Sequence, residues 1–88
     1  MLEPYELIWE IINAYDETYL NNIDMTFACD KGEYGALVKE GRVNSWVVEE
    51  NDNILTIANT DTHTERKCTV ERKDDVVVLS RATQKEQW

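Results

Sequence analysis

Residues 3–20, EPYELIWEIINAYDETYL, decide the N-terminal part of the fold. Apolar side chains recur there at helical spacing, and acidic or amide side chains collect on the opposite face. Pro4 suits the first position of a helix, and early glutamates favour the positive end of the helix dipole. The stretch therefore predicts one amphipathic helix over 3–20. Its expected buried stripe is Tyr5, Ile8, Trp9, Ile12, Tyr15 and Tyr19, with Ile11 and Leu20 at the margins.

After residue 20 the apolar period changes from 3.6 to 2. Ile23, Met25, Phe27 and Cys29 alternate with less apolar residues, which is typical of a half-buried strand. Turn-forming residues then divide the chain into segments, and Glu40-Gly41 has the composition of a two-residue hairpin loop. We expect further strands near 34–39, 42–49, 54–59, 65–72 and 76–81, and residues 82–88 as a flexible tail.

These elements define one domain, residues 1–88, of the α+β class. An N-terminal amphipathic helix precedes a five- or six-stranded antiparallel meander spanning about 23–81, since consecutive hairpins favour pairing between neighbours. The sheet either curls around the helix or closes as a small barrel. The strand pattern is compatible with both arrangements.

Several strands are apolar on both faces. Trp46 and Val48 share one face of a 42–49 strand, with Val43 and Val47 on the other. A single-layer sheet with one wet face shows cleaner alternation. We therefore expect a closed barrel, or a second sheet face covered by a partner or another copy, a dimer being the commonest case. The residues assigned to this contact are Trp46, Val48, Leu55 and Ile57.

Charge is unevenly distributed along the 88 residues, whose formal net charge is -9. Residues 1–30 carry seven carboxylates and no Lys or Arg, whereas residues 63–88 carry a net charge of +1. Such a field repels a phosphate backbone and attracts basic surfaces. Direct nucleic-acid binding is not expected.

No motif points to a reaction, a metal or a cofactor. His63 is the only histidine and falls in an expected turn, so it is not expected to activate a nucleophile. Two cysteines and one histidine do not match the spacing of a zinc site, and no glycine-rich phosphate loop is present. We expect no enzymatic activity, no catalytic residue, no metal and no cofactor.

The expected compartment is the cytoplasm, because neither a signal peptide nor an apolar run long enough for a membrane span is visible. Cys29 and Cys68 are then expected to be free buried thiols, with a disulfide between them as the less favoured alternative.

The leading functional hypothesis is a non-enzymatic inhibitor that occupies a basic site of another protein, such as a nucleic-acid-handling enzyme. Carboxylates spaced along a rigid helix can imitate a row of phosphates. In composition alone (short, acidic, α+β, without a cofactor motif) the chain resembles small phage or mobile-element proteins that block host defences, anti-CRISPR proteins among them. The expected partner-binding residues are Glu3, Glu6, Glu10, Asp16, Glu17 and Asp24. The alternative is a self-assembling, barrel-like module that binds a small ligand or peptide between subunits.

Overall fold

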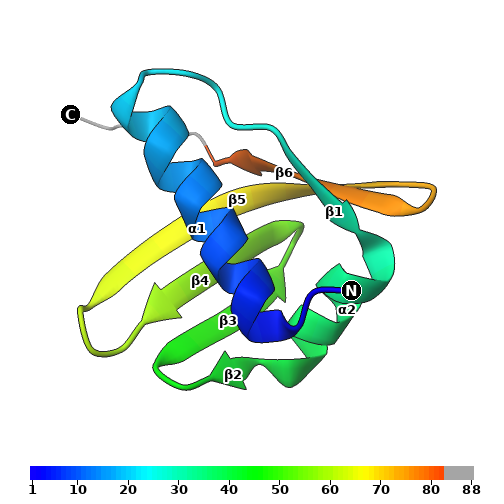
Figure 1. Ribbon diagram of the computed structural model, residues 1–88, viewed down its shortest axis with the longest axis horizontal. Coiled ribbons are helices and arrows are strands. Elements are labelled where there is room, and N and C mark those ends of the chain that lie inside the picture. The colour runs from blue at the N-terminus through cyan, green and yellow to red at the C-terminus, as the bar shows by residue number, and fades with distance from the viewer. Residues whose placement is uncertain (83–88) are drawn as a thin grey trace.

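A curled antiparallel sheet holds one long helix against its concave face (Figure 1). The structure, a computed structural model, describes residues 1–82. The elements, in chain order, are α1 (Pro4–Leu20), β1 (Phe27–Asp30), α2 (Lys31–Glu40), β2 (Arg42–Val43), β3 (Trp46–Asn51), β4 (Ile54–Asn59), β5 (Thr64–Lys73) and β6 (Val76–Arg81).

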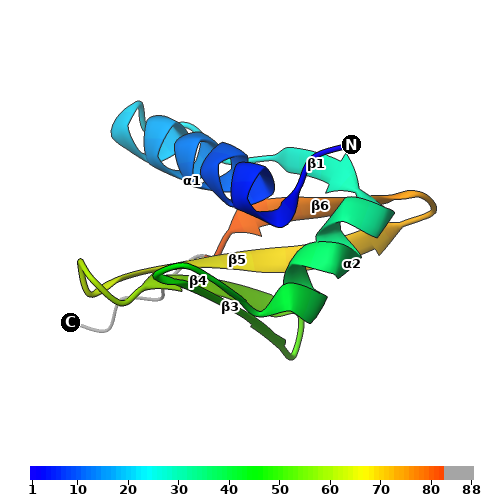
Figure 2. The ribbon, with the colours of Figure 1, turned by 60° about the horizontal axis from the view of Figure 1, so that its bottom comes forward.

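The six strands lie in the order β1-β6-β5-β4-β3-β2, and every neighbouring pair is antiparallel. The sheet curls through 192° as a half-barrel, so it wraps around the helix. Figure 2 shows α1 across the concave side, with α2 beside its N-terminal end. The expected α+β class, N-terminal helix and antiparallel sheet are confirmed.

The core lies between α1 and the inner face of the sheet. Because side chains alternate along each strand, one set of strand residues faces α1 and the other faces outward. The buried set comprises Leu7, Ile8, Ile11 and Ile12 from α1, Met25 from the following loop, Tyr34 and Leu37 from α2, and Cys29, Trp46, Val48, Leu55, Ile57, Cys68, Val70, Val77 and Leu79 from the strands.

The buried face of α1 is rotated relative to the expected stripe, so that prediction was partly wrong. Leu7 and Ile11 are fully or almost fully buried, whereas Trp9 and Tyr19 are 42% and 67% exposed. The aliphatic residues at the i, i+3 and i+4 positions interdigitate with the sheet, and the larger aromatic rings lie along the edges of the helix. The size of an apolar side chain in this stretch therefore does not decide whether it is buried.

The expected strand near 34–39 is instead helix α2. The Asp30 carboxylate accepts a hydrogen bond from Gly32 N at 3.0 Å, which caps the helix, and Gly41 ends it with φ 74°. Tyr34 and Leu37, three residues apart, form its buried side. Glu40-Gly41 is therefore a helix terminus and not a hairpin.

Helix α2 also changes the topology that a simple meander predicts. It carries the chain from one edge of the sheet to the other, so that β1 pairs with β6 and only β2–β6 follow one another as neighbours. β1 begins at Phe27, later than expected, and Ile23 precedes it in an exposed loop.

The expected strand 42–49 is divided by a turn at Asn44-Ser45. Val43 pairs with Trp46 across this turn and packs against the core, so both side chains lie on the inner face. The expected opposition of Val43 and Trp46 was wrong because an unbroken strand was assumed. The predicted β4 and β6 bounds agree with the structure, and β5 is longer by one residue at each end.

Two glycines of opposite conformation test the α2 assignment. A Cβ at Gly35 meets nothing within 4 Å, and the residue lies inside a helix, so we expect Gly35→Ala to stabilise the fold by about 0.5–1 kcal/mol. At Gly41, with φ +74°, an L side chain is strained, and Gly41→Ala should destabilise by about 1 kcal/mol. Urea unfolding of both variants measures the difference, and equal effects at the two positions would contradict the assignment.

Candidate functional site

Four exposed carboxylates line the outer face of α1: those of the N-cap residue Glu3 and of Glu6, Glu10 and Glu17. The Glu6 carboxylate also accepts a hydrogen bond from Glu3 N at 2.9 Å, which caps the helix. The four carboxylates lie opposite the buried aliphatic residues because both sets follow the helical repeat. Exposed Asn13 continues the row between Glu10 and Glu17. We call Glu3, Glu6, Glu10, Asn13 and Glu17 the acidic face of α1. No Lys or Arg occurs in α1 or in the loop after it, so no basic residue of these segments neutralises the row.

Two further predicted partner-binding residues lie elsewhere. Asp16 is on the flank of α1, where its two carboxylate oxygens accept hydrogen bonds from Arg66 Nε and Nη2 at 2.9 and 3.0 Å. This paired geometry fixes α1 to β5 and neutralises Asp16. Asp24 is exposed in the loop between α1 and β1. The structure therefore brings Glu3, Glu6, Glu10 and Glu17 together but separates Asp16 and Asp24 from them.

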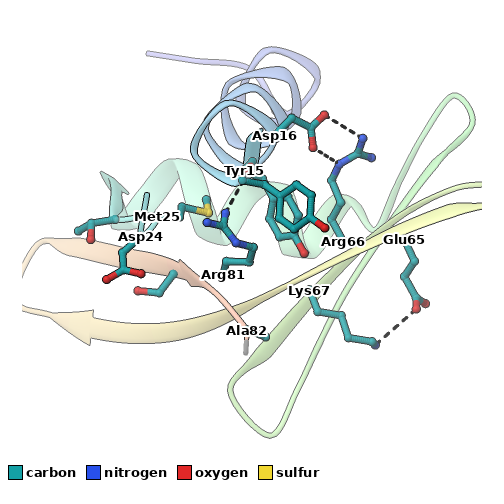
Figure 3. Close-up of a pocket in the computed structure, with 12 residues that line it drawn as sticks. Tyr15, Asp16, Asp24, Met25, Glu65, Arg66, Lys67, Arg81 and Ala82 are labelled. Atoms are coloured by element: carbon teal, nitrogen blue, oxygen red, sulfur yellow. Dashed lines mark hydrogen bonds and ion pairs between the residues drawn. The ribbon is translucent and has the colours of Figure 1, made fainter. Parts of the chain in front are cut away.

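An open hollow of about 1000 Å³ lies below the C-terminal half of α1, between the helix and the ends of β5 and β6 (Figure 3). Its lining mixes both signs of charge with aromatic rings, and includes Tyr15, Tyr19, Asp24, Arg66 and Arg81. Burial raises the pKa of Tyr15 above its usual value.

Arg81 has a structural role at this hollow. Its guanidinium donates to Tyr15 O at 3.1 Å, Thr18 Oγ1 at 2.9 Å and Ile23 O at 2.7 Å. It also lies over the rings of Tyr15 and Tyr19, 5.3 and 5.6 Å from their centroids. A cation at the C-terminal end of a helix satisfies free carbonyls and the dipole together. With Arg66 bound to Asp16, both arginines of the hollow are thus engaged within the protein.

A second polar cluster joins α2 to the sheet. Tyr34 Oη donates to Glu50 Oε1 at 2.7 Å, and Arg72 Nη2 donates to the same oxygen at 2.8 Å. The bond from Arg72 lowers the pKa of Glu50, while burial and the bond to Glu50 raise the pKa of Tyr34. These hydrogen bonds link the three side chains and stabilise the contact between α2 and the sheet.

The residues assigned to a second-face contact lie inside the protein. Trp46, Val48, Leu55 and Ile57 are at most 7% exposed and form part of the core beneath α1. They point inward because the sheet uses that face to cover the helix. The outward positions of the same two strands are Val47, Glu49, Ile54, Thr56 and Ala58.

Cys29 and Cys68 are free and buried, as expected. Cys29 lies opposite Val77 and Cys68 opposite Arg81, with β6 between their strands. Strand spacing and rise separate their Cα atoms by on the order of 15 Å, far beyond the reach of a disulfide. Burial raises the pKa of each thiol to about 11. His63 is exposed in the turn between β4 and β5.

Within residues 1–82, no three His, Cys, Asp or Glu side chains gather closely enough to hold a metal ion. None of the helices in this part of the chain has the length and apolar character required to span a membrane. The comparisons with protein-family models, curated proteins and solved structures give no match to this chain.

An aromatic ladder is the feature that sequence reasoning missed. Tyr5 and Trp9 meet edge to face with centroids 6.3 Å apart, and Trp9 meets Trp46 in the same way at 5.7 Å. Trp46 is buried, whereas Tyr5 and Trp9 are 46% and 42% exposed. The i, i+4 spacing of Tyr5 and Trp9 was the available signal, but both residues had been assigned to the core. They lie on the flank of α1 next to the acidic face.

Replacing Glu50 tests the polar cluster. A lowered pKa in the fold means that ionised Glu50 stabilises the protein above its ordinary pKa and that this contribution disappears as the pH falls. We expect Glu50→Gln to cost about 1–2 kcal/mol at pH 7 and much less at an acidic pH low enough to protonate the native side chain. Urea unfolding at the two pH values gives the difference. Glu49→Gln, at an exposed outer position, is the control, and a pH-independent loss in Glu50→Gln would contradict this role.

The thiols provide a test of burial. A pKa raised from 9.0 to about 11 leaves about 100-fold less thiolate at pH 8. We therefore expect a thiol-specific reagent to modify folded Cys29 and Cys68 at least about 100-fold more slowly than it does in concentrated urea. Rapid modification of either thiol in the folded protein would show that its strand opens.

Proposed function

We propose that this chain is a non-enzymatic binding protein whose acidic α1 face occupies a basic, nucleic-acid-binding site of another protein. In this role it acts as an inhibitor, in the manner of phage or mobile-element anti-defence proteins such as anti-CRISPR proteins. The observation that carries the proposal is the row of exposed carboxylates at Glu3, Glu6, Glu10 and Glu17, without an interspersed base.

The row has the rigidity and spacing that phosphate mimicry requires. Glu3, Glu10 and Glu17 are seven residues apart, so they recur about every 10 Å along one side of the helix, with Glu6 between the first two. Duplex DNA presents one phosphate per strand about every 3.4 Å of axis. The spacing thus matches a subset of phosphates, and the buried side of α1 fixes the backbone positions from which the carboxylates extend.

Opposite charge also sets the kind of partner. A basic cleft that binds the row exchanges its contacts with nucleic acid for contacts with carboxylates, so protein and nucleic acid compete for one site. The proposed setting is the cytoplasm, where buried free thiols such as Cys29 and Cys68 are the usual state of cysteine.

A second candidate function is the self-assembling module. It is supported by the outer sheet face, on which Val47, Ile54, Ala58 and Val78 are only partly exposed and which no helix of the described chain covers. Under this alternative, a ligand or peptide binds between subunits. Analytical ultracentrifugation of the wild type and of Ile54→Lys distinguishes it, because a dimer through this face dissociates in the variant.

Charge reversal tests the leading proposal. We expect Glu6→Lys/Glu10→Lys/Glu17→Lys to abolish capture of a basic nucleic-acid-binding protein from a lysate of the source organism. The control Glu40→Lys/Glu49→Lys/Glu71→Lys has the same net charge, and its exposed positions lie off α1. It should retain the captured protein. Duplex DNA or RNA added to the wild-type complex should release it, and rising salt should weaken it steeply.

Equal losses in the two triple variants would mean that net charge alone drives binding. Retention by both variants, or failure of nucleic acid to compete, would overturn the proposed site.

A further inference from the structure

The aromatic flank of α1 gives the proposed site a more specific chemistry. We propose that Tyr5 and Trp9 form a platform for an arginine side chain of the partner's basic surface, with Glu6 of the acidic face beside it. This inference rests on the proposed function, because it names what the acidic face recognises.

The protein already holds a guanidinium over another pair of aromatic rings with the same spacing on α1. Tyr15 and Tyr19 are separated by four residues on α1, and the Arg81 guanidinium lies over both rings at 5.3 and 5.6 Å. Tyr5 and Trp9 have the same i, i+4 spacing on the same helix. Among residues 1–82, the guanidinium contacts with aromatic rings are those of Arg72 on Tyr34 and of Arg81 on Tyr15 and Tyr19. The Tyr5–Trp9 pair is therefore open to a cation supplied from outside the described chain.

The platform is held in place before a partner arrives. Trp9 packs edge to face on Trp46, which is 7% exposed and belongs to the core. Tyr5 in turn packs on Trp9. Aromatic side chains have few rotatable bonds, and this packing limits them further, so little conformational entropy is lost on binding.

The neighbouring charges select a cation. Glu6 lies three residues before Trp9, so these two exposed side chains are neighbours on the helix surface and join the aromatic flank to the carboxylates of the acidic face. A purely apolar partner would have to approach these carboxylates without compensating them. A guanidinium pairs with a carboxylate through its N–H groups and stacks on a ring through its plane, so it satisfies both features. The ammonium of lysine provides the charge but not the planar stack.

Two peptides of equal charge separate these effects. The probes are hexa-arginine and hexa-lysine, titrated calorimetrically into the full chain at constant salt. We expect the wild type to bind hexa-arginine at least about threefold more tightly, and Tyr5→Ala and Trp9→Ala each to weaken hexa-arginine binding about fivefold while removing the preference. Trp9→Phe keeps an aromatic ring at this position and should retain the preference. This variant can still be measured if Trp9→Ala does not fold. Leu20→Ala, at an 80% exposed apolar position on the same helix, is the control and should bind like the wild type.

A spectroscopic readout locates the contact. Hexa-arginine should shift the indole Nε1–H resonance that is absent from the spectrum of Trp9→Phe. The Glu6→Lys/Glu10→Lys/Glu17→Lys variant should weaken both peptides to a similar degree.

If that charge variant loses binding while Tyr5→Ala and Trp9→Ala bind as the wild type does and no arginine preference exists, the platform is overturned and the acidic site stands. If the charge variant binds both peptides as the wild type does, the acidic site itself is overturned.

Discussion

The packing of one aliphatic face of α1 against the concave sheet is the constraint on which the rest of the structure depends. Leu7, Ile8, Ile11 and Ile12 are at most 3% exposed, and no second helix of comparable length covers the described part of the sheet. In a chain of 88 residues, where core volume is limited, this contact supplies much of the apolar burial. It also fixes the orientation of α1. Once the aliphatic face is buried, the glutamates at the opposite positions must face solvent.

Among residues 1–82, the polar contacts of three arginines lie away from that outward face. Arg66 and Arg72 stand at the two ends of the inward-facing row of β5, on either side of buried Cys68 and Val70, and Arg81 stands near the end of β6. Each binds inside the protein: to Asp16, to Glu50, and to the C-terminal end of α1. These contacts stabilise the edges of the helix–sheet interface. To pair with the acidic face, these three basic side chains would have to leave their present partners.

The periodicity of apolar residues correctly predicted the elements whose formation depends on the local sequence. The helix over 3–20 and the strands β4, β5 and β6 have clear periods bounded by turn residues, and they appear within one residue of their expected limits. Helix α2 was missed because Gly32 and Gly35 weaken a short helical pattern, and its Asp30 cap also fits a turn. The pairing of β1 with β6 is a long-range consequence of α2. For the candidate site, the exposed glutamates could be predicted from the helical repeat. The neutralisation of Asp16 and the exposure of Trp9 could not, because both depend on the side chains that meet α1 from the sheet.

Magnitudes indicate why an acidic face benefits from an aromatic neighbour. Exposed ion pairs contribute about 0.2–1 kcal/mol each, so four such pairs supply at most roughly 4 kcal/mol, which corresponds to a millimolar Kd. Long-range charge mainly accelerates encounter and orients the partners, whereas buried aromatic and arginine anchors slow dissociation. The hollow near Arg81 lacks a strong long-range charge, since its acidic and basic side chains largely offset one another. The N-terminal half of α1 combines charge with aromatic anchors, because Tyr5 and Trp9 adjoin a row of carboxylates that has no ion pair within residues 1–82. An arginine-bearing basic surface is the kind of partner for which both features contribute to binding.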